Sequence, residues 1–152
     1  LVLSGTVVRC SLVGQIESPL EAFVNPSSFK IYQADTGLLV SKAGAQRADI
    51  LAGIGGTFMG ALTENYVAQQ LSAIGYPLHY WTRDNRAEID FVVERQGCVS
   101  AIEVKAGENT RSRSLSSLKK SHPGVRLIRL STKPFGMNDG LRSIPLYAAF
   151  CL

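Results

Sequence analysis

The stretch EIDFVVERQGCVSAIEVKAG, residues 88–107, decides the expected fold. Apolar and polar residues alternate in two runs within it, residues 88–94 and 99–105, and Gln96-Gly97 stands between the runs. Strict alternation is typical of a half-buried strand, and a two-residue turn containing glycine fixes the register of a hairpin. The sequence therefore predicts an antiparallel hairpin with Gln96 and Gly97 at its tip.

The register of this hairpin predicts which side chains meet across the strands. Asp90 would face Glu103 and Glu88 would face Lys105, with the two carboxylates roughly 5 Å apart at Cβ. The opposite face would be apolar and would consist of Ile89, Phe91, Val93, Ile102 and Val104. Because like charges directly opposite one another are destabilising, the pattern indicates a divalent cation with oxygen ligands between the carboxylates.

A helix is predicted over residues 57–74, with Gly75 as its C-terminal stop. Glu64 falls on the apolar stripe of that helix, together with Val67 and Leu71. A buried carboxylate needs a partner, because an unpaired buried charge is very costly. Two interpretations stay open: Glu64 joins the acidic site, or it serves the start of the helix as a cap or through the helix dipole.

The remaining elements follow from the same rules. Strands are expected within residues 1–34 and over residues 78–81 and 125–130, and a short helix over residues 114–121. The order from the long helix onward is then helix, three strands, helix, strand. This order predicts an α/β fold with a mixed sheet flanked by helices.

Composition favours one ordinary, soluble, enzyme-like domain. The chain has 152 residues and a net charge of +4, and none of its apolar runs reaches the ~18 residues that a membrane span needs. The start has neither a signal-peptide pattern nor an initiator Met, so we expect a piece of a longer, cytoplasmic protein without a membrane partner. Three scattered cysteines fit neither a disulfide framework nor a zinc site.

Cations gather downstream of the hairpin. From Lys105 onward the sequence is rich in Lys and Arg and poor in acidic residues. A basic segment beside a carboxylate site suits a polyanionic substrate, although exposed helices and loops also carry such residues. The candidate nucleic-acid contacts are Arg111, Arg113, Lys119 and Lys120.

A helix carboxylate, an aspartate on one strand and an E-x-K tripeptide on the next strand follow one another in this chain. The residues concerned are Glu64, Asp90, Glu103, Val104 and Lys105. In this order they resemble the PD-(D/E)XK nuclease superfamily, with Ile89 where that superfamily usually has proline. The resemblance implies a restriction-endonuclease-like core and a nuclease that acts on nucleic acid, with DNA favoured, through Glu64, Asp90, Glu103 and Lys105.

Phosphodiester hydrolysis needs charge neutralisation, an activated water and help for the leaving oxygen. Asp90 and Glu103 are suitable ligands for Mg²⁺ or Mn²⁺, and the carbonyl of Val104 is a further candidate ligand. Glu64 would complete the acidic cluster or hold a second metal ion. Lys105 would orient or deprotonate the attacking water, or offset charge in the transition state.

A closer resemblance covers nearly the whole chain. FKIYQADTGLL, ALTENYVAQQL and HYWTRDNRAEIDFVVE are similar to the uncharacterised domain found C-terminal to an AAA+ ATPase module in many prokaryotic proteins. It implies that residues 1–40 are the remnant of a winged-helix-like segment and that residues 41–152 are the nuclease-like domain. It also implies an ATPase module upstream in the same polypeptide. GIGGTFMG lacks the lysine of a phosphate-binding loop.

Two alternative functions correspond to other features of the sequence. A catalytically silent nucleic-acid- or partner-binding module, coupled to the ATPase, would keep the fold and the basic segment without using the carboxylates. Asp35-Thr36-Gly37 is similar to the aspartic protease signature, but that chemistry needs two aspartates and the sequence has no second copy. The tripeptide is more typical of a turn.

Overall fold

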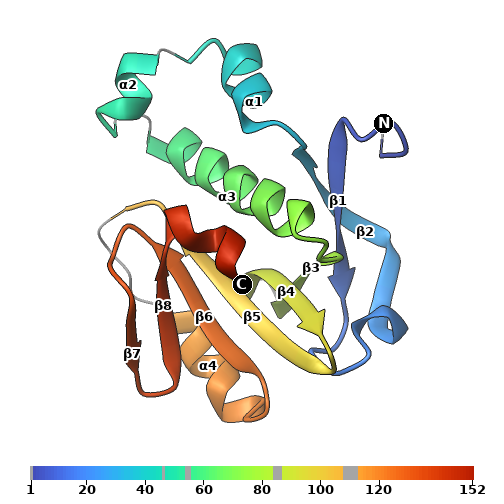
Figure 1. Cartoon of the computed structure of the whole chain (residues 1–152). Coiled ribbons are helices and arrows are strands. Elements are labelled where there is room, and N and C mark those ends of the chain that lie inside the picture. The colour runs from blue at the N-terminus through green and yellow to red at the C-terminus, as the bar shows by residue number, and fades with distance from the viewer. Residues whose placement is uncertain (1, 46, 54–55, 84–86, 108–112) are drawn as a thin grey trace.

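One mixed sheet forms the centre of the molecule. The computed structural model describes residues 2–45, 47–53, 56–83, 87–107 and 113–152, and its strands run in the order β2-β1-β3-β4-β5-β6-β8-β7 (Figure 1). The strands are β1 (Val7–Val13), β2 (Val24–Gln33), β3 (Leu78–Arg83), β4 (Ala87–Arg95), β5 (Cys98–Lys105), β6 (Arg126–Ser131), β7 (Gly136–Asn138) and β8 (Leu141–Pro145). The helices are α1 (Thr36–Ala43), α2 (Arg47–Leu51), α3 (Gly56–Ala73) and α4 (Arg113–Ser121), with the 3-10 helices η1 (Leu20–Phe23) and η2 (Leu146–Cys151).

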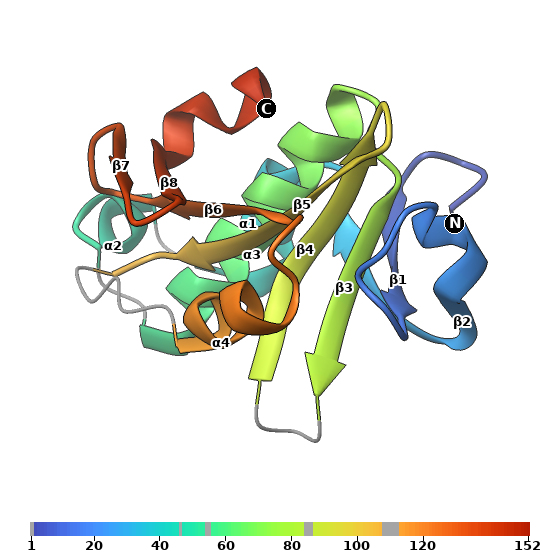
Figure 2. The ribbon, with the colours of Figure 1, turned by 90° about the horizontal axis from the view of Figure 1, so that it is seen from below.

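Helices cover both faces of this sheet, so the protein has two apolar layers (Figures 1 and 2). Val67 and Leu71 of α3 pack with Phe91 and Ile102 on one face, which we call the α3 face. On the other, the α4 face, Leu115 and Leu118 of α4 pack with the apolar side chains of β3, β4 and β5. No described helix is both long and apolar enough to pass through a lipid bilayer.

The central unit has the predicted order α3-β3-β4-β5-α4-β6. Strands β3, β4 and β5 pair antiparallel, and β6 lies parallel to β5, so α4 is the crossover between them. Gly75 ends α3 with φ 88°, a conformation that favours glycine, and Tyr76 N donates to Leu71 O at 3.1 Å. The expected mixed sheet with flanking helices is confirmed.

The N-terminal segment belongs to the same sheet. Strand β1 pairs antiparallel with β2 and parallel with β3, where Cys10 is the partner of Leu78. The predicted boundary at residue 40 therefore does not separate two sheets, and the winged-helix origin of this segment stays a prediction. Asp35 caps α1, since its side chain accepts hydrogen bonds from Gly37 N and Leu38 N. The sequence does not predict helices α1 and α2 or strands β7 and β8.

Asn65 ties α3 to the end of β2. Its Oδ1 accepts from Gln33 N at 2.8 Å and its Nδ2 donates to Gln33 O at 3.1 Å, and only 3% of the residue is exposed. Asn65→Ala leaves both backbone groups without this partner, so we expect it to lower the free energy of unfolding by about 2 kcal/mol. Urea denaturation measures the loss. Gln70→Ala on the same helix is the control, and an equal effect of both variants would contradict the assigned role.

Candidate functional site

Strands β4 and β5 part at the predicted acidic site. Paired residues run from Arg95–Cys98 to Phe91–Ile102, which confirms the register set by Gln96 and Gly97. Both turn residues have positive φ, 52° and 74°, as a two-residue hairpin turn requires. The ladder ends at the Phe91–Ile102 pair. The expectation that Asp90 pairs with Glu103 across the strands is therefore wrong.

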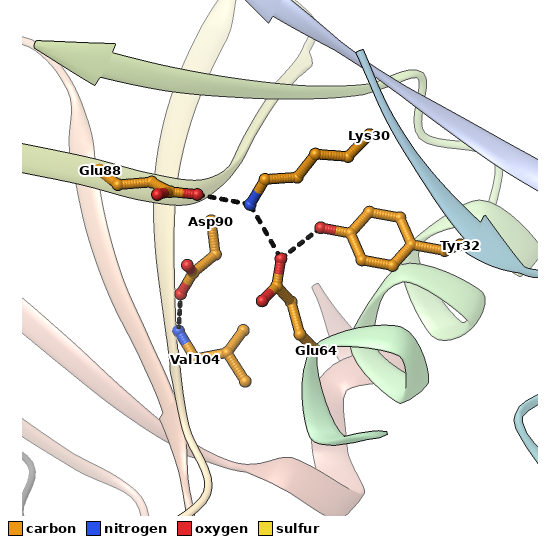
Figure 3. Close-up of polar contacts among 6 residues, drawn as sticks. All are labelled: Lys30, Tyr32, Glu64, Glu88, Asp90 and Val104. Atoms are coloured by element: carbon orange, nitrogen blue, oxygen red, sulfur yellow. Dashed lines mark hydrogen bonds and ion pairs between the residues drawn. The ribbon is translucent and has the colours of Figure 1, made fainter. Parts of the chain in front are cut away.

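Asp90 fills the gap between the parted strands with its side chain. Its Oδ2 accepts a hydrogen bond of 2.7 Å from Val104 N (Figure 3). The N–H and C=O of one strand residue point the same way, so the Val104 carbonyl is directed toward the same gap. Asp90 thus contacts the backbone N–H of Val104, and the role of the Val104 carbonyl as a metal ligand stays a prediction.

A bulge in β4 determines where Asp90 points. His79 pairs with Val92 and Trp81 with Ile89, so Asp90 and Phe91 together lie opposite one residue of β3, Tyr80. The extra residue reverses the alternation between Ile89 and Phe91. Ile89 therefore packs on the α4 face and Phe91 on the α3 face, which corrects the expectation that both share one apolar face.

The environment of Asp90 favours its protonated form. Burial raises its pKa to about 7, and the charges of Glu64 and Glu103 act in the same direction. The hydrogen bond from Val104 and the charge of Lys30 oppose the shift but do not cancel it. Carboxyl groups with a pKa raised in this way occur at functional sites and in structural ion-pair networks.

Glu103 and Lys105 form an ion pair at the end of β5. Lys105 Nζ lies 2.7 Å from Glu103 Oε1, and Glu103 is only 5% exposed. Since Ile102 and Val104 pack on the α3 face, alternation places Glu103 and Lys105 on the other side of β5. The second oxygen, Oε2, is buried and makes no hydrogen bond with the described residues.

Glu64 has partners that the sequence analysis missed. Its Oε1 lies 3.0 Å from Lys30 Nζ and accepts a hydrogen bond from the Tyr32 hydroxyl (Figure 3). Lys30 Nζ also lies 2.5 Å from Glu88 Oε1. Strand β2 brings Lys30 and Tyr32 to this position. In the sequence, the only sign of them is a lysine and a tyrosine two residues apart in FKIY, a spacing that places both on one face of a strand.

The three acidic residues do not gather into one metal-binding group. Among the described residues, no three or more His, Cys, Asp or Glu side chains are placed to hold a metal ion together. Glu64 is instead bound to a lysine and a tyrosine. The two residues that meet the requirements of a cation are Asp90, whose charge is destabilised, and Glu103, which has an unsatisfied buried oxygen.

The predicted nucleic-acid contacts are not all beside this site. Arg111 and the side chain of Arg113 lie outside the described part of the chain. Lys119 pairs with the Asp139 carboxylate and also donates to Asp139 O at 2.7 Å. Helix α4 leads from the end of β5 to the start of β6, so Lys119 and exposed Lys120 in its last turn lie away from Lys105.

The α4 side of the sheet carries a cleft of about 760 Å³. Among its described lining residues are Trp81, Arg83, His122 and the loop of residues 14–18, and none of the predicted catalytic residues. Trp81 is 6% exposed and belongs to the apolar layer on this face.

Comparison with known proteins places the chain in a family. Residues 59–149 match the family described as "Domain of unknown function (DUF4143)". Two uncharacterised proteins, one of Mycobacterium bovis and one of Mycobacterium tuberculosis, are each 36% identical over 124 residues, which cover 76% of this chain. The matched part spans 27% of the length of these relatives. The search of solved structures found no significant match. The chain is thus a member of the DUF4143 family.

Proposed function

We propose that this chain is a metal-dependent nuclease domain with a restriction-endonuclease-like core. The element order α3-β3-β4-β5-α4-β6 supports this, with its antiparallel three-strand unit and one parallel crossover. It is the order of elements in which the PD-(D/E)XK resemblance places its helix carboxylate, aspartate and E-x-K tripeptide. The chain has these residues as Glu64, Asp90 and residues 103–105.

The proposal depends on the place where β4 and β5 part, beyond the Phe91–Ile102 pair. There Asp90 accepts a hydrogen bond of 2.7 Å from the backbone of Val104, the residue that follows buried Glu103 in β5, and the charge of Glu103 acts on Asp90. A raised pKa on Asp90 and an unsatisfied oxygen on Glu103 both call for a positive partner.

The donor set fits Mg²⁺ or Mn²⁺. Mg²⁺ takes oxygen ligands and uses only one or two carboxylates while it keeps several waters. Asp90 and Glu103 would hold the ion, and the Val104 carbonyl is the third candidate ligand. When bound, the metal ion would neutralise phosphate charge and lower the pKa of a water molecule.

Lys105 supplies a partly exposed positive charge to the proposed site. Its ammonium group contacts Glu103 at 2.7 Å and its side chain is 31% exposed, so it has access to a substrate. Placed there, it would orient a water molecule or stabilise the negative charge that develops on the phosphate oxygens. Glu64 does not act as a ligand in this proposal, because Lys30 and Tyr32 engage it.

Nucleic acid is the proposed substrate, with DNA favoured, and an ATPase module of the same polypeptide is the proposed partner. The sequence pI of about 9.1 supports attraction to a polyanion. Arg111, Arg113 and Lys120 remain proposed phosphate contacts, whereas the pair with Asp139 makes Lys119 a weaker candidate. The much greater length of the mycobacterial relatives leaves room for a further module in them.

Incubation of the purified chain with labelled nucleic acids tests the proposal. We expect cleavage of double-stranded DNA with Mg²⁺ or Mn²⁺ and none with EDTA, with single-stranded DNA and RNA tested in parallel. The Glu103→Gln variant, purified identically, controls for contaminating nucleases. Cleavage that is unaffected by EDTA, or absent from every substrate and metal combination, contradicts the proposal.

A silent binding module is the second candidate function. Two lysines neutralise two of the three acidic residues, since Lys30 pairs with Glu64 and Lys105 with Glu103. Such pairs stabilise a protein without any metal ion. Tight nucleic-acid binding that needs no metal ion, together with the absence of cleavage, is the result expected from this function.

A further inference from the structure

The ammonium group of Lys30 lies where acidic groups from two elements converge. It is 3.0 Å from Glu64 Oε1 of α3 and 2.5 Å from Glu88 Oε1 of β4. Lys30 itself belongs to β2, on the far side of β1 and β3 in the order of the sheet. The close-up in Figure 3 shows Lys30 reaching toward both carboxylates, with Asp90 beside them.

Several contacts hold this ammonium group in place. Its Nζ lies 5.1 Å from the centre of the Tyr80 ring, a distance at which the ring attracts a cation. Burial lowers the pKa of Lys30, but the hydrogen bonds and charges of Glu88 and Glu64 together raise it well above its ordinary value. Lys30 is therefore a permanent positive charge over the whole working range of pH.

The same contacts engage one oxygen of Glu64, Oε1, and place a positive charge directly beside its carboxylate. Its Oε1 is shared by the ammonium group of Lys30 and the hydroxyl of Tyr32. Burial and the charge of Glu64 raise the pKa of Tyr32, so its hydroxyl remains a hydrogen-bond donor. A divalent cation at Glu64 would lie close to the ammonium group of Lys30 and would be repelled by its charge.

We propose that Lys30 takes the place of a second divalent cation, so that the site binds a single ion, at Asp90 and Glu103. The inference rests on the proposed function. It assigns Lys30 a positioning role, because its charge acts on the reacting groups through Glu64 and Asp90.

Counting bound Mn²⁺ ions tests the inference without reference to activity. Calorimetry and electron paramagnetic resonance of the purified chain should give one ion for the wild type and two for Lys30→Met, because Glu64 then becomes available. The double variant Lys30→Met/Glu64→Gln should return to one ion. Lys42→Met, at an exposed lysine of α1, is the matched control and should also bind one.

Glu64→Gln in the wild-type background keeps the test decisive if Lys30→Met does not fold. Glutamine retains an oxygen that can accept from Tyr32, and we expect the Mn²⁺ dissociation constant to change by less than about threefold. A tenfold loss of affinity would make Glu64 a ligand and would overturn the inference. Lys30→Met that folds and still binds one ion would also overturn it.

The two proposals fail in different ways. A wild-type chain that binds no Mn²⁺ overturns the proposed nuclease function and, with it, the role of Lys30. A wild-type chain that binds one ion through Asp90, but gains none in Lys30→Met, leaves the nuclease proposal intact and overturns only the inference.

Discussion

Glu103→Gln is expected to reduce metal-dependent cleavage by at least ~10²-fold, the scale seen when one preorganised electrostatic contact to a transition state is lost. Glutamine has nearly the shape of glutamate but lacks the charge that binds a divalent cation. Initial rates on labelled DNA at saturating Mn²⁺ measure the effect. Mn²⁺ affinity, measured by calorimetry, should fall together with the rate.

The fold should tolerate this substitution. Glu103 is buried with one oxygen unsatisfied, so removal of its charge also removes a desolvation cost. Lys105 loses its partner, but its side chain is 31% exposed and can reach water. Circular dichroism and the melting temperature should therefore match those of the wild type.

Lys105→Met gives the contrasting pattern. In the proposed site the positive charge of Lys105 acts on water or on the transition state. Its removal should therefore slow cleavage while Mn²⁺ affinity is retained. A Glu103→Gln protein that cleaves at the wild-type rate would refute the assignment. So would a Lys105→Met protein that loses metal affinity rather than rate.

Asp90→Asn is expected to stabilise the metal-free protein at pH 8 but not at pH 4. Burial, together with Glu64 and Glu103, raises the pKa of Asp90 to about 7 in the folded state, whereas an unfolded aspartate has a pKa near ~3.9. The protonated group stabilises the folded state fully below about pH 4, and this contribution is lost as pH rises through about 7.

The magnitude of this effect follows from the size of the shift. A pKa that is about three higher in the folded than in the unfolded state corresponds to about 4 kcal/mol of stability. Partial access of solvent to Asp90 reduces the expected increase in the free energy of unfolding to about 2–3 kcal/mol. The Asn Oδ1 can still accept the hydrogen bond from Val104 N. Urea unfolding in EDTA at pH 4, 6 and 8 measures the difference, with Glu17→Gln as a control at an exposed acid. Identical pH profiles for Asp90→Asn and the wild type would contradict the prediction.

Local patterns predicted much of the fold. Alternation and a glycine turn fixed the β4–β5 register, and Gly75 marked the end of α3, because these signals act between residues close in sequence. The central order of strands and helices followed from the same signals. The sequence does not predict helices α1 and α2, because the hydrophobic periodicity of residues 38–56 is weak.

The details of the site depend on contacts that no local pattern contains. The bulge at Asp90 arises where β4 meets Tyr80 of β3, and it leaves Ile89 on the opposite face of the sheet from Phe91. Lys30 lies 34 positions before Glu64 in the chain, on an expected strand whose neighbours in the sheet were not predictable. The candidate residues were therefore identified, whereas their partners required the tertiary structure.

Because β1 and β2 belong to the central sheet, the part of the chain that matches the family is shorter than the part that forms the fold. The family match begins at residue 59, yet Cys10 and Tyr32 are part of the apolar layer that covers the α3 face. A fragment trimmed to residues 59–149 would expose the edge of β3 that pairs with β1 and would lose the cation beside Glu64. The sheet that surrounds the candidate site thus begins at Val7, some fifty residues before the start of the family match.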